Sequence, residues 1–210
     1  MKRKAFDNKK IGLTDKELAV LAELDTPQKI QSYVSAIPQN FERNGDSCMS
    51  VREVLRTNRA LCMEGALLAA LALWVHGDQP LILDLSAVDD DDHVIAVFKR
   101  NGCWGAISKG NHPYVRYRDP VYRTLRELVM SYFHEYYNLK GEKTLRSYSR
   151  PITLSAVSPK KWITGVDAWS VAEKLCVIKH YPLVSTASAH RLRPIEDIEK
   201  RLMRIRNFTR

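Results

Sequence analysis

The sequence lacks three features that would each indicate a class of protein. No run approaches the roughly 18 consecutive apolar residues of a membrane span, so we predict no membrane association. The four cysteines form no CxxC pair, which favours reduced thiols over a zinc site or a disulfide framework. The start, MKRKAFDNKKIG, is basic but has no apolar segment behind it, unlike a secretory signal peptide. We therefore predict a cytoplasmic protein, and no motif indicates a cofactor or a metal.

Charge is plentiful, and the basic residues are in excess. The chain has 33 Lys and Arg against 24 Asp and Glu, a net charge of +9, and the excess lies toward the C-terminal half. Basic residues among tyrosines, as in YVRYRDPVYRTLRELV, are typical of nucleic-acid-binding surfaces. The excess of basic residues suggests an acidic partner for this half of the chain. Nucleic acid is the weaker candidate, because solvated helix faces have the same composition.

The length and the order of start signals predict how the chain is organised. A chain of 210 residues favours one compact domain with terminal extensions. Helix-start signals such as Thr26 before Pro27 predict an N-terminal helical extension over residues 1–44. Residues 45–138 form the predicted core, and residues 139–210 a strand and helix extension that ends in a basic helix. We find no internal repeat and no low-complexity segment.

The core begins with an unusually apolar stretch, TNRALCMEGALLAALALW. From residue 58 to 74 Ala, Leu and Met fall on every helical face, and Arg59 and Glu64 are the only charges. A helix without a polar side is buried, so this one is predicted to lie at the centre of the domain. The short branched run LILDL that follows HGDQP predicts a strand. Helices and strands in this order predict an α+β fold.

A hairpin follows in HVIAVFKRNGCWGAIS. Asn101-Gly102 tolerates positive φ and predicts a two-residue turn between two apolar strands. That turn places Ile95 opposite Ser108, because antiparallel pairing is counted outward from the loop. The side chains of His93 and Ser108 then become diagonal neighbours on one face of the sheet.

The segment after the hairpin predicts one long amphipathic helix over residues 119–137, with Asp119 as its cap. The aromatic run SYFHEYY within it could suggest base stacking. Its apolar residues repeat at helical spacing, which predicts a stripe that packs against the core instead. The stripe consists of Leu125, Leu128, Val129, Tyr132, Phe133 and Tyr136.

Cys62 is the residue of this chain that most suggests chemistry. It lies in the first turn of the apolar helix, where unpaired N–H groups and the helix dipole favour a thiolate. A nucleophile needs a base, and His93 opens a strand 31 residues later; His112 and His134 are alternatives. The acidic run before His93, Asp89 to Asp92, could instead bind a cation, but it has no spacing typical of a metal site.

These residues resemble the transglutaminase-like superfamily of papain-related cysteine enzymes. In that superfamily the cysteine begins a buried helix, the histidine begins the next hairpin, and the acid follows a Gly-Trp element. RALCMEGALLAALAL, DDHVIAV and GCWGAISKG occupy those places here. The resemblance implies Cys62 as nucleophile and His93 as general base, with Ser108 at the position of the orienting Asp.

The resemblance also implies a reaction and a fold. It implies acyl transfer at the carbonyl of a peptide, protein or small amide or ester, without a cofactor, and a buried Cys helix packed on an antiparallel sheet. The oxyanion would bind the N–H of Cys62 and a second donor, for which Asn58 is a candidate. No Trp lies beside Cys62, and Val94-Ile95 replace the aromatic residue usually near the histidine. These departures count against a crosslinking enzyme.

Two functions follow from the sequence. The first is a cysteine hydrolase or acyltransferase of transglutaminase-like type that uses Cys62, His93 and Ser108. The second is a catalytically silent protein of the same fold that serves as a binding or scaffold module, which the serine at the acid position favours. Retention of both a cysteine and a histidine at the expected places favours the enzyme.

Overall fold

The structure is a computed structural model that describes residues 5–43 and 45–209. Its α-helices are α1 (Asn8–Ile11), α2 (Asp15–Ala22), α3 (Pro27–Ala36), α4 (Val51–Thr57), α5 (Cys62–Val75), α6 (Leu125–Met130), α7 (Trp169–Val177), α8 (Thr186–Ala189) and α9 (Asp197–Leu202). Its strands are β1 (Leu81–Ala87), β2 (His93–Arg100), β3 (Cys103–Ser108), β4 (Arg118–Tyr122), β5 (Leu145–Ser149), β6 (Ile152–Thr153) and β7 (His180–Pro182). Short 3-10 turns are η1 (Phe133–Glu135), η2 (Leu154–Ala156) and η3 (Pro159–Lys161). The basic start, on which the signal-peptide argument depends, lies partly outside the described residues.

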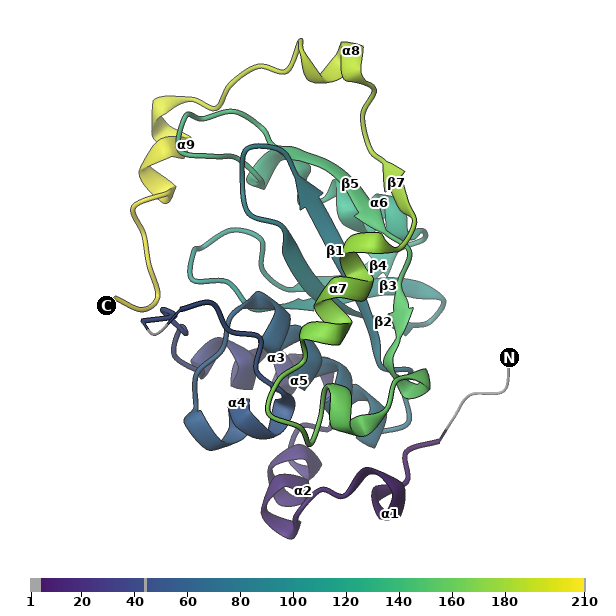
Figure 1. Cartoon of the computed structure of the whole chain (residues 1–210). Coiled ribbons are helices and arrows are strands. Elements are labelled where there is room, and N and C mark those ends of the chain that lie inside the picture. Colours follow the sequence, from purple (N-terminus) through teal and green to yellow (C-terminus); the bar gives the residue numbers. More distant parts are fainter. Residues whose placement is uncertain (1–4, 44, 210) are drawn as a thin grey trace.

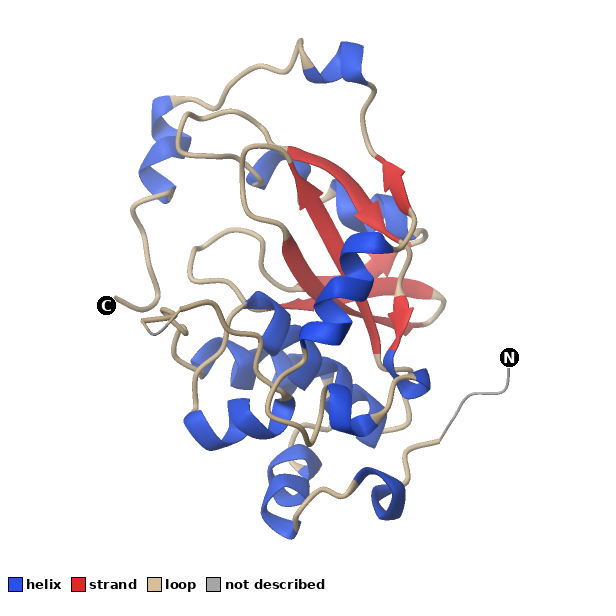
Figure 2. Cartoon of the chain, viewed as in Figure 1, coloured by secondary structure: helices blue, strands red, loops and turns tan. Residues whose placement is uncertain are grey.

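The described strands form one seven-stranded sheet. Its order is β4-β3-β2-β1-β5-β7, β6 also pairs with β1, and all pairings are antiparallel. Helices α2 to α5 gather on one side of the sheet (Figure 1), and Figure 2 shows the blue helices beside the red strands of the sheet. The predicted α+β class is confirmed. No helix in the described ranges is long and apolar enough to cross a bilayer.

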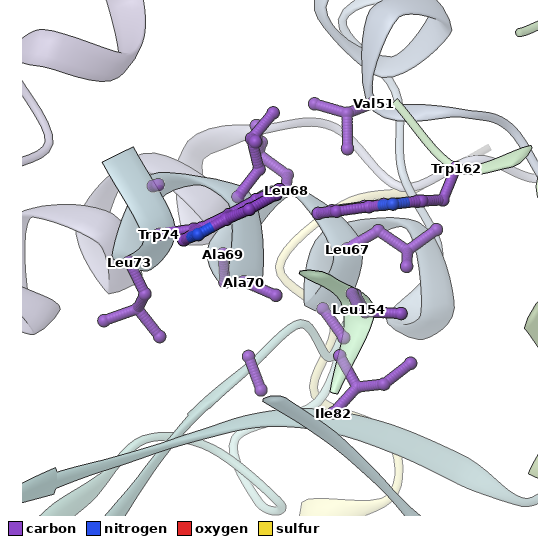
Figure 3. Close-up of a cluster of buried hydrophobic side chains, with 14 of the residues drawn as sticks. Val51, Leu67, Leu68, Ala69, Ala70, Leu73, Trp74, Ile82, Leu154 and Trp162 are labelled. Carbon is purple, nitrogen blue, oxygen red and sulfur yellow. The ribbon is translucent and has the colours of Figure 1, made fainter. Parts of the chain in front are cut away.

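Helix α5 is the central element, as its composition predicts. Every residue from Glu64 to Trp74 is buried. It packs against the sheet through small and branched side chains, and Trp74 stacks on Trp162 with ring centroids 6.2 Å apart (Figure 3). The helix begins at Cys62 rather than at residue 58, because Asn58 adopts a left-handed conformation with φ of 49° and ends α4. Cys62 is therefore the first helical residue.

The β2–β3 hairpin has the predicted register. Asn101 and Gly102 have φ of 50° and 81°, as a tight two-residue turn requires, and Ile95 pairs with Ser108. Alternation along the strands divides the sheet into two apolar faces. The face toward α5 contains Ile82, Val94, Ala96, Phe98 and Ile107, and the other contains Leu83, Leu85, Ile95, Val97 and Ala106.

The predicted helix over residues 119–137 is wrong. The chain forms strand β4, then α6, then η1. Pro120 has no N–H, which suits it to the edge strand β4, and Asp119 is exposed there rather than capping a helix. Thr124 is the actual cap of α6, since its side chain accepts the N–H of Glu127. Most of the predicted stripe is nevertheless buried against the second face of the sheet, with Leu125 partly buried beside it.

Candidate active site

The three predicted site residues lie at the ends of three elements. Cys62 is the first residue of α5, His93 the first of β2, and Ser108 the last of β3. The backbone N–H of Val94, just beyond the last pair of the β2–β3 ladder, lies near enough to Cys62 to lower the pKa of its thiol. The start of α5 is thereby placed beside the start of the histidine strand.

A glycine allows this close approach of α5 to the hairpin. A Cβ built on Gly65 would lie 2.5 Å from the Cβ of Lys109, the residue that follows β3. Any larger residue would push the first turn of α5 away from the strand ends. Gly65 therefore helps to hold Cys62 near Val94.

His93 and Ser108 are in direct contact, as the register predicts. His93 Nε2 and Ser108 Oγ are 2.8 Å apart, and the Ser108 hydroxyl donates to the Val115 carbonyl at 2.6 Å. A hydroxyl has one proton, so Ser108 can only accept from His93. The Nε2 atom therefore carries the imidazole proton, and Nδ1 is the basic nitrogen.

Gln31 of helix α3 holds Ser108 from the outer side of the strand. The Ser108 N–H donates to Gln31 Oε1, and Gln31 Nε2 donates to the Ser108 carbonyl, both at 2.9 Å. The side-chain amide thus takes the place of a neighbouring strand. Sequence analysis missed this residue, because no local pattern signals a contact across 77 positions.

Burial decides the protonation of Cys62, against the sequence-based expectation. Burial raises the pKa of the Cys62 thiol, and this outweighs the N–H groups of Val94 and Met63, which lower it. The helix N-terminus acts in the predicted direction but does not prevail. Cys62 rests as a thiol at neutral pH.

Burial also keeps His93 uncharged. It lowers the pKa of His93 from 6.5 to about 4, so the imidazole is neutral at pH 7. A neutral imidazole can accept a proton, and a neutral thiol can supply one. The pair would therefore work by general-base transfer rather than from a preformed ion pair.

Glu64 has a structural role in the same turn. Its fully buried carboxylate accepts the N–H of Leu61 at 2.6 Å and that of Met49 at 2.9 Å. These bonds fix the chain that enters α5. Burial raises the pKa of Glu64, the two backbone N–H groups lower it, and burial prevails.

His93 opens onto a cavity of about 170 Å³. The cavity is lined by Asp90, Asp91, Asp92, His93, Gly110, His112, Tyr114, Val115, Tyr136 and Tyr137. A second cavity of about 490 Å³ shares five of these residues and extends to Met203 and Arg206 near the C-terminus. A substrate could reach the imidazole between carboxylates and tyrosines.

Cys62 and the His93 side chain are positioned at the start of β2 by different contacts. His93 pairs with Leu85, whose side chain lies on the sheet face opposite α5. The Cys62 sulfur instead meets the strand at the Val94 N–H. Within the described residues no hydrogen bond joins Cys62 to His93, and Cys62 does not line the cavity. A working contact between the thiol and Nδ1 stays a prediction.

The alternative residues are less well placed than His93. His112 lines both cavities, but its Nδ1 accepts from Arg206 at 3.0 Å. His134 is exposed and packs edge-on against Phe133. Asn58 is exposed and caps α4, which is a structural role, and its predicted role as oxyanion donor stays a prediction.

The acidic run, Asp89 to Asp92, stabilises the turn between β1 and β2. Asp92 Oδ1 accepts the N–H of Ala87 at 2.8 Å, and Asp90 Oδ2 accepts from the Thr144 hydroxyl at 2.7 Å. In the part of the chain that the structure describes, no three His, Cys, Asp or Glu residues are grouped to hold a metal ion.

Sequence analysis missed a second histidine pair, on the α5 face. Asp84 pairs in register with Val94, and its Oδ2 lies 3.1 Å from His180 Nε2. His180 Nδ1 lies 2.8 Å from the Ile178 carbonyl and must donate to it. Burial raises the pKa of Asp84 to about 6, although His180 opposes this.

Comparison with known proteins identifies no family or curated relative for this chain. No protein-family model matches the chain, and the search of curated proteins finds no match.

Proposed function

We propose that this protein is a cysteine-dependent acyl-transfer enzyme of transglutaminase-like type. Cys62 is the nucleophile, His93 the general base, and Ser108 the residue that orients the imidazole. The observation that carries the proposal is the chain of hydrogen bonds from His93 Nε2 through Ser108 Oγ to the Val115 carbonyl. It leaves Nδ1 unprotonated, as a base requires.

The reaction follows from these roles. As the sulfur attacks the carbonyl carbon of an amide or ester, Nδ1 of His93 takes the thiol proton. The N–H of Cys62, which as the first residue of α5 has no helical carbonyl to bond to, stabilises the oxyanion. The imidazolium then protonates the leaving amine or alcohol. Water or an amine attacks the resulting thioester, with His93 again accepting the proton, and the thiol is restored.

The serine makes this site weaker than a site with a carboxylate. Within the described residues no carboxylate is hydrogen-bonded to the His93 ring to stabilise the imidazolium that forms during attack. The pKa of about 4 means that protonating His93 costs about 3 kcal/mol more than protonating an ordinary histidine. We therefore expect slow turnover.

The fold supports the same proposal. A buried helix with the cysteine at its start packs on an antiparallel sheet, and the histidine and serine strands are adjacent in it. This order of elements agrees with the one that the sequence resemblance implies, and so supports the proposal. A cytoplasmic location and a peptide, protein or small amide or ester substrate remain predictions from the sequence.

A chromogenic acetyl ester tests the proposal. Acetylation of each cysteine is followed by mass spectrometry at pH 4 to 8, with exposed Cys176 as the ordinary thiol and buried Cys48 as the unreactive one. We expect Cys62 to be acetylated faster than Cys176, with the rate falling as pH approaches 4 because His93 becomes protonated. The excess should vanish in His93→Gln. A Cys62 rate equal to that of Cys176, and unchanged in the variant, would contradict the proposal.

One observation favours a catalytically silent binding or scaffold module. The thiol and the imidazole share no hydrogen bond, and burial keeps both uncharged. In that case the basic C-terminal half would bind an acidic partner. Salt-dependent retention on polyglutamate, without acetylation of Cys62 by any ester or amide tested, would support this second function.

A further inference from the structure

Val115 has a backbone conformation that its side chain disfavours. Its φ is 54°, in the left-handed region that β-branched residues rarely enter. Its side chain is 7% exposed and packs against the second face of the sheet. Such a residue keeps this conformation only where its surroundings enforce it.

Glu135 of η1 supplies the enforcing contact. Its Oε2 accepts the N–H of Val115 at 3.0 Å and that of Arg118 Nη2 at 2.6 Å. Arg118 is itself held, because its Nε donates to Ser131 Oγ at 2.9 Å and its guanidinium lies over the Tyr132 ring at 4.2 Å. The carboxylate is thus a fixed anchor for the Val115 backbone.

The orientation of Val115 decides where the proton of Ser108 goes. The carbonyl of Val115 takes the Ser108 hydroxyl proton at 2.6 Å, and this obliges Ser108 to accept from His93 Nε2. A rotated Val115 would free the hydroxyl to donate to Nε2 and would shift the imidazole proton to Nδ1. The base would then face the wrong way.

We propose that Glu135 is a positioning residue that sets the tautomer of His93 through Val115 and Ser108. It does not touch the imidazole, and it acts only through Val115 and Ser108. Its catalytic consequence rests on the proposed function, but its effect on the tautomer does not.

The tautomer can be measured without any substrate. Histidine labelled with ¹⁵N at both ring nitrogens distinguishes the Nε2–H from the Nδ1–H form by chemical shift, and His93→Gln assigns its signals. We expect the wild-type protein to show His93 as the Nε2–H tautomer at pH 7. Glu135→Ala should shift it toward a mixture, and Glu135→Gln should largely restore it, because one amide oxygen can accept both bonds.

Glu17 provides a matched control. It accepts a backbone N–H, that of Thr14 at 2.7 Å, and pairs with Arg52 at 2.7 Å, yet it lies on α2 away from His93. Glu17→Ala removes the same kinds of contact and should leave the His93 signals unchanged. A His93 tautomer that is unaffected by Glu135→Ala in folded protein would overturn the inference.

Ester acetylation separates this inference from the proposed function. Where Cys62 is active, Glu135→Ala should slow its acetylation in proportion to the fraction of His93 that leaves the Nε2–H form, about twofold for an equal mixture. An inactive Cys62 together with the expected tautomer shift would refute the enzyme and uphold the role of Glu135. An active Cys62 with an unchanged tautomer would uphold the enzyme and refute the role of Glu135.

Discussion

The two histidine pairs of the sheet differ in what each ring nitrogen is bonded to. His180 has a carboxylate partner in Asp84, but its other nitrogen donates to the Ile178 carbonyl, so neither nitrogen is available as a base. His93 has only a hydroxyl partner, yet the direction of that bond leaves Nδ1 basic. Proximity to a carboxylate therefore does not by itself leave a histidine with a basic nitrogen. The bond made by the other ring nitrogen decides that.

The largest expected effect separates the two histidines by activity. His93→Gln should reduce acetylation of Cys62 by at least about a thousandfold, because the thiol loses its base. His180→Gln should leave the rate within a few-fold of wild type. Stopped-flow measurement of ester cleavage on both variants checks this. Equal losses in the two would remove the distinction between the pairs.

The free energy of unfolding should depend more on His180 than on His93, the reverse of the order expected for activity. His180→Ala leaves the buried carboxylate of Asp84 without its partner and should lower the free energy of unfolding at pH 7 by about 3 kcal/mol. Asp84→Asn, which removes the charge, should cost less. Urea denaturation measures both. A His180→Ala variant as stable as the wild type would mean that Asp84 is neutral in the folded protein.

The two pairs should also give opposite dependences on pH. The pKa of His93 falls from 6.5 to about 4, so its contribution to the free energy of unfolding is complete above pH 6.5 and is lost as pH falls toward 4. The pKa of Asp84 rises from 3.8 to about 6, so its contribution to the free energy of unfolding is complete below pH 3.8 and is lost as pH rises through 6. Each amounts to about 3 kcal/mol.

Urea denaturation between pH 4 and 7 separates these contributions. His93→Gln should make the free energy of unfolding fall more steeply, or rise less, with increasing pH than in the wild type. Asp84→Asn should change the slope in the opposite direction. Slopes that move together would show that the two sites do not titrate as their burial requires.

The smallest effect concerns the serine itself. Ser108→Asp places a carboxylate where the hydroxyl now donates to the Val115 carbonyl. Two acceptors would face each other, so we expect no gain in acetylation rate and a loss of stability of about 1–3 kcal/mol. Ser108→Ala should cost a similar amount or less. Faster acetylation of Cys62 in the Asp variant would show that the Val115 carbonyl can turn away from residue 108.

Local signals predicted much of the candidate site. Asn101-Gly102 is enough to determine the hairpin register, and the register alone brings His93 next to Ser108. The uniformly apolar composition of α5 predicts its central position, with Cys62 at its start. The helix predicted after residue 118 is wrong, because a Pro next to an Asp opens a helix or occupies an edge strand equally well.

The sequence by itself determined the hairpin, the buried helix and the order of the cysteine and the histidine, since each depends on neighbours within a few residues. Only the tertiary structure decided the partners: Gln31 against Ser108, Glu135 against Val115, and His180 against Asp84. It also decided the charges, because the pKa values of Cys62 and His93 are governed by burial. Burial sums contributions from distant segments, and no local pattern encodes that sum.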